Sequence, residues 1–267
     1  MSAKIAVAFD LDDTLLLDDL TISDYTIDVL RRAAAAGVVV IPASGRARDS
    51  MKPFVEQIGC ASCYISCNGA EVWGADHALL MRKRIPQETA LEIARFGAEH
   101  GSYAQTYEGA KFYYSMEGEY ARSYAASSML TGEYVGDLEA YLTGRETSKI
   151  LMMDSDEKIA AMLTEARKQF DGRVSVTCSK SWFLEFNPIG ATKGEALAWC
   201  GERFGFELAN AVTFGDSLND LSMLQTAGTG VVMANGRPDV KALIPTVCRS
   251  NMEDGVAHYI EEHILTR

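Results

Sequence analysis

The sequence predicts an α/β protein in which a core with a parallel β-sheet is interrupted by an inserted α+β domain. Three observations carry this prediction. Short apolar runs alternate with amphipathic helical segments in residues 1–81, and the same alternation returns in residues 187–267. Between them, residues 82–186 contain paired strand-like segments that are rich in tyrosine. A chain of 267 residues is long enough for two such domains.

The first segment is predicted to alternate strand and helix. Its buried strands are predicted at residues 5–10, 38–41 and 64–67, where continuous apolar runs suit a sheet covered on both faces. Ser23 can cap the first helix, which ends before Gly37, and the second helix has Met51 and Phe54 on its apolar face. Consecutive strand–helix–strand units form parallel sheets with right-handed crossovers.

The inserted segment is predicted to be of α+β type. Its helices are predicted at residues 86–100, 117–130 and 156–170, and its strands at 103–105, 112–115, 149–153, 174–178 and 182–186. In the last segment, strands are predicted at 211–214, 230–233 and 246–248, and helices at 192–205, 217–227 and 238–243, followed by a terminal helix. We therefore predict a discontinuous core of residues 1–81 and 187–267 and an inserted domain of residues 82–186.

The composition disfavours several classes of protein. With 25 basic against 37 acidic residues the net charge is −12, which disfavours binding to nucleic acid or to an anionic membrane surface. No apolar stretch reaches the ~18 residues of a membrane span, and residues 5–9 are too short for the apolar part of a secretion signal. Six cysteines are too few for a disulfide scaffold. We therefore expect Cys60, Cys63 and Cys67 to be reduced thiols and the protein to be cytoplasmic.

Acidic residues gather at two strand ends. Asp10 and Asp12 directly follow the first predicted strand, and Asp216 and Asp220 follow the strand at 211–214. Because the carboxyl ends of parallel strands meet at one edge of the sheet, these side chains can share a crevice. Such carboxylates repel one another unless a cation is present, and their oxygens suit Mg²⁺. The alternative interpretation of the first motif alone is a solvated acidic turn.

Further motifs at element ends suit phosphate. Ser44 and Gly45 close the second predicted strand with a hydroxyl and a backbone amide before a helix, which is a favourable place for an anion. Lys193 opens the first helix after the insertion with an ammonium group, and Asn68 ends the third strand. Each of them alone is a weak signal, but their coincidence along one sheet edge predicts a phosphate site. Ser217, in contrast, is expected to cap the helix predicted to begin there.

The ordered motifs resemble those of a known family. Four stretches are similar, in order, to the four motifs of the haloacid dehalogenase superfamily: Asp10-x-Asp12-x-Thr14-Leu15, Ser44-Gly45-Arg46, Lys193-Gly194 and Gly215-Asp216-x-x-Asn219-Asp220. The position of the inserted domain is similar to that of the cap in the Cof-type sugar-phosphate phosphatases. Smaller features agree, namely Asn68-Gly69-Ala70, Val232-Met233-Ala234-Asn235 and Ser250-Asn251. The resemblance implies a Rossmann-like core with an inserted cap.

The resemblance also implies roles for these residues. Asp10 would be the nucleophile that forms an aspartyl-phosphate, and Asp12 would protonate the leaving alcohol and then activate water. Mg²⁺ would bind Asp10, the backbone carbonyl of Asp12 and Asp216, with Asp220 as a further or indirect ligand. The phosphoryl oxygens would be bound by Ser44, Gly45, Lys193, Asn219 and Asn68. Asp13 stands where the family often has glycine, and no role for it follows from the sequence.

The activity that these expectations favour is Mg²⁺-dependent hydrolysis of a small phosphorylated metabolite, with a sugar phosphate as the first choice. A phosphomutase acting on sugar phosphates is the alternative enzyme. A non-catalytic regulator that binds a phosphorylated metabolite is the alternative outside enzymes. The cap would select the substrate, and its candidate contacts are Tyr107, Glu108, Lys180 and Trp182, each of which also suits ordinary cap surface or packing.

Overall fold

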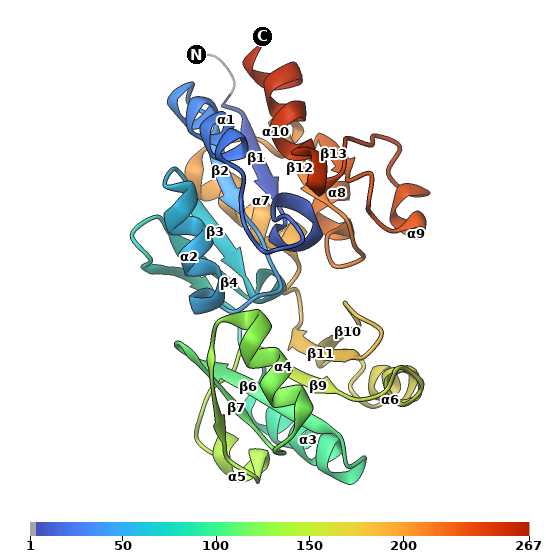
Figure 1. Cartoon of the computed structure of the whole chain (residues 1–267). Coiled ribbons are helices and arrows are strands. Elements are labelled where there is room, and N and C mark those ends of the chain that lie inside the picture. Colours follow the sequence, from blue (N-terminus) through green and yellow to red (C-terminus); the bar gives the residue numbers. More distant parts are fainter. Residues whose placement is uncertain (1–3, 267) are drawn as a thin grey trace. The chain divides into compact units, whose positions relative to one another are not determined.

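The structure is a computed structural model that describes residues 4–266, and its chain contacts divide them into two units (Figure 1). The first unit contains residues 4–45, 51–81 and 192–266, and the second contains residues 46–50 and 82–191. Each unit has its own hydrophobic core. The predicted fold class, an α/β core with a parallel sheet and an inserted α+β domain, is confirmed.

A four-stranded parallel sheet forms the centre of the first unit, with the strand order β13-β12-β1-β2. The strands are β1 (Ala6–Phe9), β2 (Val39–Pro42), β12 (Ala211–Gly215) and β13 (Thr229–Val232). Alternate residues of β1 belong to different buried clusters, Val7 and Phe9 to one and Ala6 and Ala8 to another. Both faces are therefore covered, which is why the strand is a continuous apolar run. Phe9 pairs with Phe214, so the residues that follow these two strands lie side by side.

The strand β3 (Cys63–Ser66) is attached to this sheet by an isolated parallel bridge between Ala43 and Ile65. Its regular partner is the antiparallel strand β4 (Glu71–Gly74), and β5 (Leu79–Arg82) completes a three-stranded sheet in the order β3-β4-β5. The sequence predicted β3 but missed β4 and β5. β5 is mostly exposed and therefore lacks a buried apolar pattern, whereas β4 is as short and as buried as β3 and was missed all the same.

Helices cover the sheet of the first unit. They are α1 (Asp24–Ala35), α2 (Arg48–Ile58), α7 (Lys193–Phe204), α8 (Leu221–Thr226), α9 (Pro238–Lys241) and α10 (Gly255–Ile260). Ser23 caps α1 as predicted, because its Oγ accepts the backbone N–H of Thr26 at 3.0 Å. Side chains of α1, α2 and α10 pack with Val7 and Phe9, and those of α7 pack with the other face of β1. This packing places the N-terminus of α7, and therefore Lys193, within the first unit.

Two predictions for the last segment are wrong. The helix predicted from Ser217 begins only after Asp220, because the Asp220 carboxylate binds the backbone amides of Asp216 and Ser217 and holds this stretch as a loop. Ser217 is therefore not a helix cap. The strand predicted at residues 246–248 is reduced to one bridge between Val247 and β13, at a place where Val247 is half-exposed.

The second unit is built on a six-stranded sheet with the order β10-β11-β9-β6-β7-β8, in which β7 and β8 are parallel and the other described pairs are antiparallel. Its strands are β6 (Tyr103–Glu108), β7 (Lys111–Tyr114), β8 (Thr131–Tyr134), β9 (Ile150–Met153), β10 (Val174–Thr177) and β11 (Phe183–Pro188). Its helices are α3 (Gln87–Glu99), α4 (Glu119–Ser128), α5 (Leu138–Leu142) and α6 (Asp156–Gln169). Phe96 and Phe170 pack against Phe186 in its core. The sequence missed β8 and α5, which are short, and β8 is largely exposed.

The six cysteines carry free thiols. Cys63 and Cys67 are buried and Cys60 is partly buried. Burial raises the pKa of the Cys60 thiol, which keeps it protonated and disfavours reaction with oxidants or metals. Within residues 4–266, no helix combines the length and the apolar character that crossing a membrane requires.

Candidate active site

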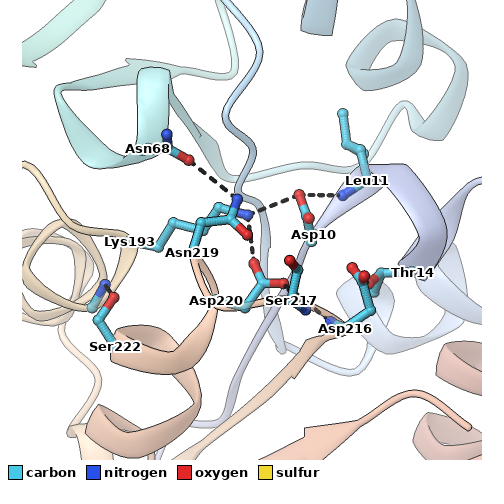
Figure 2. Close-up of polar contacts among 11 residues, drawn as sticks. Asp10, Leu11, Thr14, Asn68, Lys193, Asp216, Ser217, Asn219, Asp220 and Ser222 are labelled. Atoms are coloured by element: carbon cyan, nitrogen blue, oxygen red, sulfur yellow. Dashed lines mark hydrogen bonds and ion pairs between the residues drawn. The ribbon is translucent and has the colours of Figure 1, made fainter. Parts of the chain in front are cut away.

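Asp10 lies where the chain leaves β1, and its position is set by the sheet. Its backbone N–H donates to the carbonyl oxygen of Phe214 at 3.1 Å, which continues the parallel ladder by one residue. The residue is 5% exposed, and Oδ1 accepts the backbone N–H of Leu11 at 2.8 Å. Figure 2 shows this carboxylate at the centre of the polar contacts. Asp10 is therefore a nearly buried carboxylate at the carboxyl end of a central strand, which is the crevice of an open α/β sheet.

Lys193 brings a cation to Asp10 from the first turn of α7. The side chain is fully buried, and Nζ lies 2.9 Å from Oδ1 of Asp10 and 2.5 Å from Oδ1 of Asp220 (Figure 2). Burial alone lowers the pKa of an ammonium group, but the two carboxylates outweigh it, so the pKa of Lys193 lies above its usual value. Lys193 is therefore charged, and its charge is shared between two acids.

Asp220 and Asp216 belong to the loop that follows β12. Oδ2 of Asp220 accepts the backbone N–H groups of Asp216 at 3.0 Å and of Ser217 at 3.1 Å, while Oδ1 binds Lys193. Both oxygens of Asp220 are thus used to hold the loop and the lysine. Asp216 Oδ1 accepts the hydroxyl of Thr14 at 3.2 Å, which ties this loop to the one after β1.

The acids of this cluster are difficult to ionise without a further cation. Burial raises the pKa of Asp10 well above its usual value, and repulsion from Asp220 adds to this against the attraction of Lys193. The pKa of Asp216 rises to about 7 because of burial, then of repulsion from Asp220 and Asp13. An added cation would lower both pKa values.

The donor set fits a hard divalent cation. Carboxylate oxygens of Asp10, Asp216 and Asp220 lie within 4.8 Å of one another. All three offer oxygen, the ligand atom that Mg²⁺ prefers, and the raised pKa values of Asp10 and Asp216 indicate that these two acids lack compensating positive charge. Because both oxygens of Asp220 have other partners, the arrangement favours Asp10 and Asp216 as direct ligands of the cation. Asp220 would then hold Lys193 and the loop of Asp216 without binding the cation itself.

The residues expected to bind phosphate converge beside Lys193. The Ser44 backbone N–H donates to Ile65, and its carbonyl oxygen accepts the backbone N–H of Asn68 at 3.1 Å. Asn219 Nδ2 donates to Oδ1 of Asn68 at 3.2 Å (Figure 2). A Cβ atom at Gly45 would lie only 2.9 Å from this same Oδ1, so glycine permits the close approach. The loops after β2, β3 and β12 therefore meet at the side chain of Asn68.

Two contacts that build the site were not anticipated. Gly69 has a φ of 101°, and a Cβ there would lie 2.2 Å from the carbonyl oxygen of Thr192, so glycine lets the loop after β3 touch the start of α7. Ser222 Oγ accepts the backbone N–H of Gly194 at 3.1 Å and thereby attaches α7 to α8. The Asn68-Gly69 pair was a visible signal for the first contact. A serine inside a helix carries no such signal for the second.

The candidate cap residues all have partners within the second unit. Tyr107 donates its hydroxyl to that of Tyr124 at 2.8 Å. Glu108 accepts the hydroxyl of Tyr141 at 3.1 Å. Nζ of Lys180 lies 5.7 Å from the centre of the Trp182 ring. These contacts give each residue a structural role, and their role in binding substrate stays a prediction.

Known proteins resemble this chain over almost its whole length. The profile of the haloacid dehalogenase-like hydrolases matches residues 7–260. The 5-amino-6-(5-phospho-D-ribitylamino)uracil phosphatase YcsE of Bacillus subtilis is 30% identical over 260 residues, which cover 97% of this chain and 95% of that protein. An HMP-PP phosphatase of Serratia proteamaculans is 29% identical over 262 residues, 95% of this chain and 93% of that protein. A haloacid dehalogenase-like hydrolase from Bacteroides thetaiotaomicron has a solved structure with a TM-score of 0.87 at 26% identity, covering 97% and 99% of the two chains. The chain therefore belongs to the haloacid dehalogenase-like hydrolases, and among them to the Cof-type phosphatases.

Proposed function

We propose that this protein is a Mg²⁺-dependent phosphatase that transfers the phosphoryl group of its substrate to Asp10 and then to water. The observation that carries the proposal is the nearly buried carboxylate of Asp10, held by the ammonium of Lys193 at the carboxyl end of β1. A carboxylate attacks a phosphate dianion only when nearby positive charge offsets their repulsion. Lys193 supplies part of that charge, and Mg²⁺ held by Asp10, Asp216 and the backbone of Asp12 would supply the rest.

The reaction divides into two transfers. In the first, an oxygen of Asp10 forms a bond to phosphorus as the bond to the leaving oxygen breaks, and Asp12 gives that oxygen a proton. In the second, Asp12 takes a proton from water, whose oxygen attacks phosphorus and releases Asp10. Asp12 suits this exchange because it is half-buried and lies two residues from Asp10 in the loop after β1.

The phosphoryl group would be bound by the loops that converge beside Asp10. Ser44 offers its hydroxyl and Gly45 its backbone N–H, and Lys193 offers its ammonium group. Asn68 and Asn219 offer carboxamides, whose mutual hydrogen bond at 3.2 Å fixes their orientation. Each group is a hydrogen-bond donor, which matches the three acceptor oxygens of a phosphoryl group.

Residues 1–81 and 187–267 form the proposed catalytic core, and residues 82–186 the proposed cap that selects the substrate. Sugar phosphates are the first candidates, with phosphorylated cofactors behind them. The phosphatase activities named for the two relatives, on a phosphoribitylamino-uracil and on HMP-PP, support a small phosphorylated metabolite. The cytoplasm is the proposed location, supported by the six free thiols, which suit a reducing compartment.

Hydrolysis of 4-nitrophenyl phosphate tests the proposal. Activity should require Mg²⁺ and be absent in EDTA, and Asp10→Asn should abolish it. Asp12→Asn should lower turnover by ~10²–10⁴-fold, as expected when a proton transfer is lost. Asp171→Asn, at an exposed aspartate of the second unit, is the matched control. Full activity in Asp10→Asn would exclude Asp10 as the nucleophile.

A panel of phosphorylated metabolites then identifies the substrate and the acceptor. Release of inorganic phosphate from a sugar phosphate in a single turnover indicates hydrolysis. Formation of an isomeric sugar phosphate without free phosphate would instead establish the phosphomutase.

A further inference from the structure

Two motifs of the sequence, Val232-Met233-Ala234-Asn235 and Ser250-Asn251, take no part in the chemistry above. In the structure both lie against the loops that carry the acids. Residues 233–237 follow β13, at the carboxyl edge of the sheet where β1 and β12 also end. We call this stretch the clamp segment. Its hydrogen bonds reach the loop after β1 and the loop after β12, both within the first unit.

Asn235 bridges the loop after β1 to the chain around Asn251. Its Nδ2 donates to the carbonyl oxygen of Asp13 at 2.7 Å, and its Oδ1 accepts the backbone N–H of Asn251 at 3.1 Å. The carbonyl oxygen of Asp13 can only accept and the backbone N–H of Asn251 can only donate, so the orientation of the Asn235 carboxamide is determined. Aspartate cannot make both bonds, and alanine makes neither.

Asn251 extends the bridge to the other end of the same loop. It is 4% exposed, and its Nδ2 donates to the carbonyl oxygen of Leu16 at 2.9 Å. The loop itself is irregular, since Asp12 has an extended backbone and Asp13 a left-handed one with a φ of 56°. A loop without a regular hydrogen-bond pattern depends on contacts from outside for its shape.

The clamp segment also holds the loop of Asp216. The backbone N–H of Arg237 donates to the carbonyl oxygen of Asp216 at 2.8 Å, and that of Met233 donates to Gly215 at 3.1 Å. One short stretch of chain is therefore bound to the backbone on both sides of the acidic cluster. Moving the clamp would change the spacing between the Asp12 loop and Asp216.

We propose that Asn235 is a positioning residue for the phosphatase reaction, acting through the backbone of Asp13 to aim the Asp12 carboxyl at the leaving oxygen. This inference rests on the proposed function, because it needs Asp12 to be the proton donor. Asn235 is itself exposed, so its replacement removes two hydrogen bonds without opening the core. A misplacement of ~1 Å at a reacting group can cost about 10²-fold in rate.

The dependence of rate on the leaving group tests this role. Nitrophenolate leaves with little need for a proton, whereas phenolate needs one, so kcat/KM is measured for both 4-nitrophenyl phosphate and phenyl phosphate. The kcat/KM of Asn235→Ala should fall by ~10–100-fold on phenyl phosphate, as for other residues that orient a functional group. The fall in kcat/KM on 4-nitrophenyl phosphate should be several-fold smaller. Asn235→Asp, which keeps the size and loses the donor, should show the same difference.

The matched control is Asn210→Ala, which replaces an asparagine just before the opposite, amino end of β12. It should leave both rates unchanged, and its thermal midpoint should equal that of Asn235→Ala. The positioning role would be overturned if Asn235→Ala lost kcat/KM equally on the two substrates or lost none. It would also be overturned if the loss came with a lower thermal midpoint than that of the control. Asp12→Asn separates the two proposals. If it shows the leaving-group difference and Asn235→Ala does not, this inference alone fails; if Asp12→Asn lacks it, the assignment of Asp12 fails and this inference with it.

Discussion

The buried lysine of the site should be a large contributor to the stability of the metal-free protein. Lys193 is fully buried, with Nζ 2.9 Å from Asp10 and 2.5 Å from Asp220. Lys193→Met keeps much of the volume but leaves two carboxyl groups facing each other without a cation. Breaking a buried ion pair by removing one partner costs ~3–5 kcal/mol, because the remaining charge has no compensation. We expect a loss of this size in the free energy of unfolding at pH 8.

The loss should be smaller at pH 5. The pKa of Lys193 is raised, so its stabilising effect is complete below the ordinary lysine value of about 10.4 and is lost only as the pH rises through the folded value. The wild-type lysine therefore contributes equally at pH 5 and pH 8. In the variant, Asp10, whose pKa is raised by burial, takes up a proton at the lower pH, and its repulsion from Asp220 ends.

Urea unfolding in EDTA measures this effect for the wild type, Lys193→Met, Asp220→Asn and the double variant. The double variant should lose less than the sum of the single losses, by ~0.5–3 kcal/mol, since the two groups interact directly. Lys158→Met is the control, because its pair with Asp154 is partly exposed and is worth only ~0.2–1 kcal/mol. The reasoning would be refuted if the losses in the free energy of unfolding of the two single variants added within ~0.5 kcal/mol to that of the double variant. It would also be refuted if Lys193→Met lost no more of this free energy than Lys158→Met.

Three further predictions follow from single contacts. Thr14→Val removes the hydroxyl that donates to Asp216 at 3.2 Å, so the affinity of the resting protein for Mg²⁺ in calorimetry should fall by ~10–100-fold; an unchanged affinity would contradict this. The pKa of Asp216 is raised to about 7, mainly by burial, so the metal-free folded protein keeps a proton that the unfolded chain releases near pH ~4. Its free energy of unfolding should therefore fall as the pH rises from ~4 to ~7, and urea titrations should show less of this fall in Asp216→Asn; identical profiles would exclude the raised pKa. In the second unit, Lys149 pairs with Glu185 where both are buried, and Glu185 Oε2 has no hydrogen-bond partner among the described residues. Lys149→Met should cost ~3–5 kcal/mol in urea unfolding, and adding Glu185→Leu should recover most of it; no recovery would mean that an unpaired carboxylate is not the cause.

Sequence patterns predicted the buried strands β1, β2 and β3, and missed the buried strand β4 and the mostly exposed strands β5 and β8. β1 is a continuous apolar run because both of its faces are covered, and that pattern is visible without a structure. β5 and β8 have four residues each and are mostly exposed, so hydrophobic burial leaves no trace in their sequence. Ser217 was expected to be a helix cap because serine is common there, but the Asp220 carboxylate binds the backbone amides of Asp216 and Ser217 and holds this stretch as a loop, so the helix begins after Asp220.

The sequence by itself determined which chemical groups stand at the strand ends, because burial dictates the strands and the polar residues that follow them are plain to see. Asp10 and Asp216 were found in this way, and Lys193 was found from its place at the start of a helix. Tertiary structure alone decided which of these groups meet, such as Thr14 with Asp216, 202 positions away, and Asn235 with Asp13. The physical reason is that such contacts depend on the order β13-β12-β1-β2 and on its register, which arise from the packing of the whole sheet and leave no local pattern in the chain.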